Sequence, residues 1–203
     1  MKKYAVLHEP GDIVTLAGTR FVVLDVERRG SLPDSLFLLA LESVGASEFG
    51  SSNNYAESDL KKAVDKWLED MGKRGLDNAK LIPREIDLTT LDGSGCYGKL
   101  SVKAAPLTLD EAREYADIIP NAERWCWLAT GWSGPSKSDG DLALYVSSNG
   151  DWDNNFCSNS DGIRPALKIP SDLLLDSADK PDLSEVPTDT LLEEIRRRVV
   201  DKA

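Results

Sequence analysis

The chain of 203 residues has little of the chemistry that most catalytic centres need. It contains one histidine, His8, and three cysteines, Cys96, Cys126 and Cys157. A Ser-His-Asp or Cys-His site would have to form around His8, which has no nucleophile motif beside it, so we interpret His8 as an ordinary surface or edge residue. No zinc-type spacing of cysteine and histidine occurs, and three cysteines are too few for a disulfide scaffold. We therefore expect no enzyme activity, no cofactor and no bound metal.

The chain also lacks long apolar runs and an excess of positive charge. No stretch reaches the length of a membrane span, and residues 8–12 interrupt the start of the chain before an apolar signal-peptide core can form. Its 24 Lys and Arg stand against 35 Asp and Glu, which gives a formal net charge of -11. Such a chain repels phosphate backbones and anionic lipids. We expect cytoplasmic synthesis without a signal peptide, and neither nucleic acid nor membrane as a partner.

Apolar residues make up 41% of the chain, enough to form a core. Runs of β-branched and aliphatic residues predict three strands in the first part of the chain, at 13–16, 20–26 and 36–41. Apolar residues at three- and four-residue steps predict a helix over 60–71, which Ser58 can cap and Gly72 can end. Residues 73–105 carry only brief extended signals, and no firm prediction is made there.

A second helix and a strand-rich region follow. Thr108-Leu109-Asp110-Glu111 has the pattern of a capping box, and the helix it begins should end before Pro120. Short aromatic and aliphatic runs then predict four strands, at 125–130, 142–146, 152–156 and 163–169. The sequence Ser148-Asn149-Gly150-Asp151 predicts a tight hairpin turn, because Asn-Gly tolerates positive φ.

The composition divides the chain into three parts. Residues 1–170 form the predicted domain, and residues 171–187 read as an acidic, proline-containing linker. Residues 188–203 predict a helix capped by Thr188, with an apolar stripe formed by Leu191, Leu192, Ile195 and Val199. A helix this short needs a packing partner, and we expect homo-oligomerisation through it.

Five short segments occur in an order that resembles a family of domains in bacteria and their phages. They are Ser58-Asp59-Leu60-Lys61-Lys62 followed by Trp67-Leu68, then Leu107 to Ala112 (LTLDEA), Trp125 to Thr130 (WCWLAT), Val146 to Gly150 (VSSNG) and Gly162 to Leu167 (GIRPAL). The family is similar in fold to formylglycine-generating enzymes and to the variable proteins of diversity-generating retroelements. The resemblance implies an α+β, C-type-lectin-like fold with two helices and small twisted antiparallel sheets, to which the C-terminal helix is added. The sequence departs from the family pattern at Thr130-Gly131, where Ser-Pro is usual.

Aromatic side chains among short polar ones predict a binding surface in the late loops, since paratopes mix rigid aromatic anchors with adaptable polar groups. The candidate ligand-binding residues are Trp132, Ser133, Trp152, Asp153, Asn154, Asn155, Phe156, Ser158 and Asn159. The alternative is that these rings close the core from the loop side. We interpret Trp125, Trp127 and Arg164 as structural residues.

The function predicted from these features is a ligand- or receptor-binding module, whose partner is a protein or a surface glycan. The resemblance implies a phage or prophage origin, a variable protein of a diversity-generating retroelement, and association with a virion. One alternative is a structural virion component, such as a capsid decoration or tail accessory protein. Another is an oxidase of the formylglycine-generating type, although Cys126 and Cys157 follow no catalytic motif and should be inert thiols.

Acidic residues in the same loops leave a calcium site as a further alternative. They are Asp139, Asp141, Asp151, Asp153 and Asp161. Calcium prefers such oxygen ligands, but the spacing does not match an EF-hand. Solvated loop carboxylates are the simpler interpretation.

Overall fold

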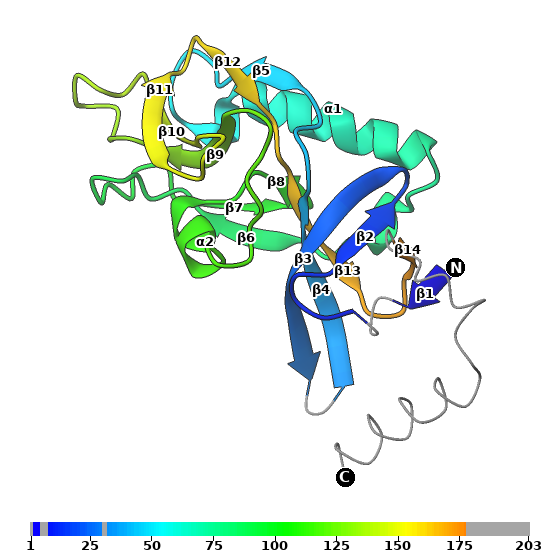
Figure 1. Cartoon of the computed structure of the whole chain (residues 1–203). Coiled ribbons are helices and arrows are strands. Elements are labelled where there is room, and N and C mark those ends of the chain that lie inside the picture. The colour runs from blue at the N-terminus through cyan, green and yellow to red at the C-terminus, as the bar shows by residue number, and fades with distance from the viewer. Residues whose placement is uncertain (1, 5–7, 30–31, 178–203) are drawn as a thin grey trace, which may run out of the picture.

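The computed structural model describes residues 2–4, 8–29 and 32–177. Two long strands lie near the centre of the fold (Figure 1). β3 (Thr19–Arg29) and β4 (Leu32–Ala40) pair antiparallel along most of their length. Four consecutive residues of β3, numbers 21–24, are buried, so both faces of this strand are covered. The turn that leads into β3 holds Ala17 at φ 48° and Gly18 at φ 77°, the left-handed values that a tight hairpin requires.

β3 and β4 lie near the centre of a seven-stranded antiparallel sheet with the order β1-β14-β2-β3-β4-β13-β8. Its other strands are β1 (Lys2–Tyr4), β2 (Ile13–Leu16), β8 (Ala104–Ala105), β13 (Ala166–Pro170) and β14 (Leu174–Ser177). The three predicted strands at 13–16, 20–26 and 36–41 are therefore confirmed, although β3 extends three residues beyond its predicted end and β4 begins four residues before its predicted start.

β14 lies inside the segment 171–187, which the sequence predicts as a linker. It pairs with β1 and with β2, so the beginning of this segment belongs to the sheet. A run of leucines at 173–175 favours an extended strand, and the acidic and proline-containing residues that follow obscure this signal in the sequence. The rest of the predicted linker and the predicted helix over 188–203 lie outside the described residues.

The first helix, α1 (Asp59–Lys73), follows a one-turn 3-10 helix, η2 (Tyr55–Glu57). Ser58 caps α1, since its side chain accepts a hydrogen bond from the Lys61 amide at 2.9 Å. The buried side chains of α1 come at the predicted three- and four-residue steps, at Leu60, Val64, Leu68 and Met71. The helix passes Gly72 and ends one residue later, and Gly75, at φ 102°, turns the chain away.

The second helix, α2 (Leu109–Glu114), begins at the predicted capping box. The Glu111 amide donates to Thr108 Oγ1 at 3.2 Å, and the Glu111 carboxylate accepts from the Thr108 amide at 2.8 Å. Both reciprocal bonds are present, so two backbone donors at the start of the helix are satisfied. The helix ends well before Pro120, as expected.

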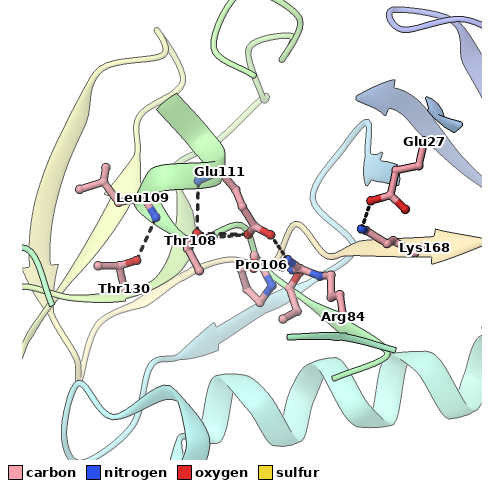
Figure 2. A network of polar contacts seen from close by, with 9 residues as sticks. Glu27, Arg84, Pro106, Thr108, Leu109, Glu111, Thr130 and Lys168 are labelled. Atoms are coloured by element: carbon pink, nitrogen blue, oxygen red, sulfur yellow. Dashed lines mark hydrogen bonds and ion pairs between the residues drawn. The ribbon is translucent and has the colours of Figure 1, made fainter. Parts of the chain in front are cut away.

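A polar network fastens α2 to the sheets around it (Figure 2). Glu111 pairs with the buried guanidinium of Arg84, which also donates to the Ala105 carbonyl oxygen at 2.9 Å. The Leu109 amide donates to Thr130 Oγ1 at 2.9 Å. Because each partner lies on a different segment, this short helix keeps a defined position that its length alone would not give it.

A second, five-stranded sheet has the order β11-β10-β9-β12-β5. Its strands are β5 (Ala46–Glu48), β9 (Cys126–Gly131), β10 (Leu142–Val146), β11 (Trp152–Phe156) and β12 (Ser160–Gly162). β9 and β12 pair parallel, and the other neighbours pair antiparallel. Between the helices, β6 (Arg84–Asp87) and β7 (Lys99–Val102) form a separate antiparallel pair, preceded by the 3-10 helix η3 (Asn78–Lys80).

The core consists of two clusters of buried apolar side chains on opposite faces of β3 and β4. Phe21 and Leu38 belong to the cluster that contains the apolar face of α1. Val22 and Leu39 belong to the cluster that contains the buried residues of α2. The fold is therefore α+β, with two helices and several antiparallel sheets, as the sequence predicts. No helix in the described part of the chain is long and apolar enough to cross a bilayer.

Candidate functional site

The candidate site lies on the β10–β11 hairpin. The hairpin is where the sequence predicts it, but five residues connect the strands and, of the Asn149-Gly150 pair, only Gly150 has a positive φ, so the predicted tight turn is not formed. Residues 147–151 form the turn, with the Ser147 amide donating to the Asp151 carbonyl oxygen at 2.8 Å and Gly150 at φ 88°. β10 and β11 then pair in register over five residues, from Val146 opposite Trp152 to Leu142 opposite Phe156. The hairpin makes β11 an edge strand of the second sheet, at one side of the molecule in Figure 1.

The alternation of side chains along β11 divides the predicted binding residues between two faces of the sheet. Trp152, Asn154 and Phe156 share a face with Val146 and Leu144, which belong to or pack against the α2 core cluster. Asp153 and Asn155 share the opposite face with their β10 partners Tyr145 and Ala143, which belong to the α1 core cluster. The sequence prediction treats these five residues as one surface, and the structure does not bring them together.

On the Asp153 face, an exposed tryptophan stacks on a buried tyrosine. The rings of Trp125 and Tyr145 are nearly parallel, at 7°, with centroids 5.0 Å apart. Tyr145 is buried beneath the stack, whereas Trp125 remains 47% exposed. One side of the Trp125 ring is therefore packed and a large part of it faces solvent. Most large apolar rings are buried, so an exposed ring that is held rigidly marks a contact surface.

Further aromatic contacts hold this stack from below. Tyr145 meets Trp127 edge to face at 6.5 Å, and Trp127 meets Phe49 in the same way at 5.5 Å. Trp127 Nε1 donates to the Ser47 carbonyl oxygen at 2.9 Å, which satisfies the one polar atom of this buried ring. The rings run from the core to the surface without a break, so Trp125 rests on a support that resists displacement.

Short polar side chains surround the stack. Asn155 Nδ2 donates to Asp161 Oδ2 at 2.8 Å, and Asn159 Nδ2 donates to Asn155 Oδ1 at 2.5 Å. Burial, together with the nearby charges of Asp153 and Asp161, raises the pKa of Tyr145. The phenol therefore stays protonated at neutral pH beside a rim rich in acceptor oxygens. We call the set Trp125, Tyr145, Asp153, Asn155, Asn159 and Asp161 the aromatic platform.

The sequence prediction includes Asp153, Asn155 and Asn159 of the polar rim, gives Asp161 only as a possible calcium ligand, and misses the rings of the platform. Trp125 is interpreted there as structural, and Tyr145 is not singled out. One signal was available, because Trp125 and Trp127 are two residues apart in a predicted strand and so share a face. Trp125 also follows two charged residues, Glu123 and Arg124, which favours exposure at the strand's start.

The remaining predicted residues lie apart from the platform. Trp132 is half-buried against the α2 core cluster, and Ser133 is buried. Asn53 Nδ2 donates to the carbonyl oxygens of Ser133 and Leu142, each at 2.9 Å, and thereby fixes the loop between β9 and β10. For Trp132 and Ser133, the alternative of a core-closing role describes their positions better than the surface role. Ser158 is exposed beside the rim residue Asn159.

Trp152 and Phe156 are exposed on the α2 face, to 41% and 56%. The Arg113 guanidinium lies over the Trp152 ring, 5.6 Å from its centroid. Phe156 lies on the edge strand β11, and no ring of the described residues packs against it as Tyr145 packs against Trp125. These two rings therefore form a second, separate apolar feature.

The cysteines do not form a redox centre in this structure. Cys126 and Cys157 are buried and free, and Cys96 is exposed and free. Burial raises the pKa of the Cys126 thiol to about 11 and that of the Cys157 thiol to about 12. A nucleophilic thiol needs the opposite shift. Both groups are apolar packing residues here, as expected for inert thiols.

His8 lies in the N-terminal turn, beside Asp12. His8 is buried, not at the surface as predicted, and its Nδ1 lies 3.3 Å from Asp12 Oδ2. The Gly11 amide donates to the Val23 carbonyl oxygen at 2.8 Å, which holds the N-terminal turn against β3. Across residues 2–4, 8–29 and 32–177, no three His, Cys, Asp or Glu side chains converge in a way that could hold a metal ion.

No protein-family model, curated protein or solved structure matches the chain.

Proposed function

We propose that this protein is a ligand-binding module that holds a sugar ring of a surface glycan on the aromatic platform. The observation that carries the proposal is the exposed Trp125 ring, stacked on Tyr145 and bordered by carboxylate and amide side chains. A sugar ring has one face of C–H groups and a rim of hydroxyl groups, and the platform offers a complement to each.

The Trp125 ring complements the apolar face of a sugar. The face of an aromatic ring carries partial negative charge, and it attracts the positively polarised C–H groups of a pyranose that lies flat on it. The support from Tyr145 and Trp127 lowers the cost of ordering the ring when the ligand binds. A rigid aromatic anchor of this kind is typical of residues that dominate binding energy.

The polar rim complements the hydroxyl groups. Asp153 and Asp161 are acceptors only, and Asn155 and Asn159 offer both donors and acceptors. Asn155 is already oriented by its bonds to Asp161 and Asn159, so the rim does not have to organise itself around the ligand. The acidic rim also disfavours sugars that carry phosphate, sulfate or carboxylate groups, and we propose a neutral glycan.

We also propose that the fold is C-type-lectin-like, and the arrangement of the sheets supports this. Strands from both ends of the described chain, β1 and β14, pair in the larger sheet, and two helices pack near it. The smaller sheet and its loops carry the platform. The origin in a phage or prophage, and the role of a variable protein of a retroelement, remain proposals from the resemblance. Sequencing the gene's neighbourhood for a reverse transcriptase and a template repeat tests both.

The test of the proposed function compares two exposed tryptophans on opposite faces. A glycan array identifies the preferred neutral sugar, and calorimetry measures its Kd for the wild type, Trp125→Ala and Trp152→Ala. Loss of a hot-spot tryptophan costs about 2 kcal/mol, roughly 30-fold in Kd, so we expect that loss for Trp125→Ala. Trp152→Ala is the matched control, with a Kd within about twofold of wild type.

Circular dichroism melts of both variants control for unfolding, and Trp125→Tyr should restore part of the affinity because it keeps a flat ring. The reverse pattern, in which only Trp152→Ala loses the sugar, would place the binding surface on the α2 face. If the protein binds tetramethylammonium but no sugar, the ligand of the platform is a cation and not a glycan.

A further inference from the structure

A cavity lies on the face of the second sheet opposite the platform. It has a volume of about 100 Å³ and is enclosed by β9, β10, the start of β11 and the segment from α2 to residue 122. Its walls are mainly apolar and include Leu39, Leu128 and Val146. Four of its lining residues are exposed and mark its mouth, whereas Leu39 and Leu128 are buried and mark its depth; the four are Ala116, Asn121, Gly150 and Trp152.

A buried cation lines the same cavity. Arg164 is only 6% exposed, and its Nε donates to the Ala40 carbonyl oxygen at 2.7 Å. Its Nη2 is buried and has no hydrogen-bond partner among the described residues. Burial lowers the pKa of Arg164, the direction expected for a charge removed from water without full compensation. A guanidinium has five donors, and much of this capacity is unused here.

No acidic side chain of the described chain lies in ion-pair contact with Arg164. Glu42 is near enough to favour the charged form of Arg164, but it forms no ion pair with it, and one of its carboxylate oxygens, Oε2, is also buried without a hydrogen-bond partner among the described residues. A buried charge without an ion-pair or full hydrogen-bond partner is costly, so proteins that retain one pair it or bind a ligand to it. The partner that this guanidinium fits best is a planar carboxylate, which accepts two parallel hydrogen bonds.

We propose that this cavity binds a small organic monocarboxylate, with the carboxylate on Arg164 and a short apolar group against the α2 side. The volume of the cavity supports a small ligand of this kind, because an apolar cavity of roughly 150 Å³ holds a benzene ring and this cavity is somewhat smaller. A chain of three to five carbons is the expected length, on the order of five to seven heavy atoms. The proposal does not depend on the platform, whose residues lie on the other face.

The experiment uses sodium butyrate as the probe and butyramide as its uncharged counterpart of the same shape. Titration of the full chain is followed by the amide spectrum and by the side-chain resonances of Arg164 Nε and Trp152 Nε1. We expect butyrate to shift these resonances with a Kd on the order of 1 mM or tighter, and butyramide to bind at least tenfold more weakly. Absence of butyrate binding, or equal binding of both compounds, overturns the proposal.

Three variants locate the site. Ala116 is exposed and lines the cavity, so Ala116→Leu fills its edge without disturbing the core, and we expect at least tenfold weaker butyrate binding. Ala79→Leu places the same change at an exposed alanine outside the cavity and should bind as wild type does. Arg164→Lys keeps the charge but loses the fork geometry and should weaken binding. If Arg164→Lys fails to fold, the two alanine variants still decide, and equal binding by both contradicts the proposal.

Discussion

The two faces of the sheet at β11 differ in how their aromatic and charged residues are packed and exposed. On the platform face, Trp125 stacks on Tyr145, which contacts Trp127, and the charges near Tyr145 are the exposed Asp153 and the half-buried Asp161. On the cavity face, Trp152 stands at a mouth, and the charge is a buried guanidinium without an acidic partner in the described chain. One strand therefore serves two environments of opposite polarity, because its side chains alternate with a period of two.

The comparison also separates recognition by stacking from recognition by charge. The platform has a flat, rigid and solvent-facing ring, which suits a ligand that lies on the surface. The cavity excludes water from a cation, and a charge–charge contact is stronger there than at the surface. Variants that act on one face, or on both, test whether this division is real.

The largest expected effect comes from Trp127→Ala, which removes the support that both faces share. Trp127 is fully buried, contacts Tyr145 and Phe49, and also lines the cavity. We expect the free energy of unfolding to fall by about 3–5 kcal/mol, as for other buried aromatic residues truncated to alanine. Urea denaturation measures the loss. A change below about 1 kcal/mol would mean that the contacts of Trp127 with Tyr145 and Phe49 do not hold the platform in place.

Gly162→Ala should have the next largest effect, at the point where β12 meets β9. A Cβ at Gly162 would lie 2.7 Å from the Trp125 carbonyl oxygen and 2.8 Å from Cys126 Sγ. The first of these is a backbone atom, so the strands must move apart, at a cost of about 1–3 kcal/mol. Because Trp125 belongs to the platform and Cys126 lines the cavity, we expect this variant to bind both the sugar and butyrate more weakly.

Gly95→Ala is the control for this variant, because a Cβ there meets no atom within 4 Å and the backbone needs no positive φ. Thermal unfolding of the two variants under the same conditions gives the comparison. Equal melting temperatures would show that the contact between β9 and β12 is loose.

The smallest effect is a chemical one and leaves stability unchanged. The raised pKa values of Cys126 and Cys157, about 11 and about 12, leave almost no thiolate at pH 7.5, whereas Cys96 is exposed. We expect Ellman's reagent to label one thiol per native chain quickly and three after denaturation. Rapid labelling of Cys126 in the native protein would show that the cavity face opens, and would revive the oxidase alternative.

Local features of the fold were predictable because they depend on neighbours within a few residues. The Thr108 capping box and the Ser58 cap are both present, and the late hairpin turns at the predicted place, although not through the predicted tight turn. The buried face of α1 follows from the spacing of its apolar residues. The segment 73–105 gave no such signals, since β6 and β7 are short strands whose pairing forms only within the fold.

The candidate site was predictable only in part. The polar residues of β11 and the following loop were found, because Asn, Asp and Ser beside aromatic residues have a recognisable composition. Trp125 was missed, since exposure of a tryptophan depends on what packs around it and not on its type. The buried position of His8 was missed for the same reason, as was the strand β14, which exists through its pairing with β1 and β2.

The sequence by itself determined where the helices begin and where the late hairpin turns, because caps, turns and periodicity act along the chain. The tertiary structure alone decided which ring is exposed, which thiol is buried and which cation lacks a partner. Those properties depend on segments that are distant in sequence, such as Tyr145 beneath Trp125 or Ala40 beside Arg164. The division of β11 between a platform and a cavity exists for the same reason: a strand has two sides, and only packing decides what each side meets.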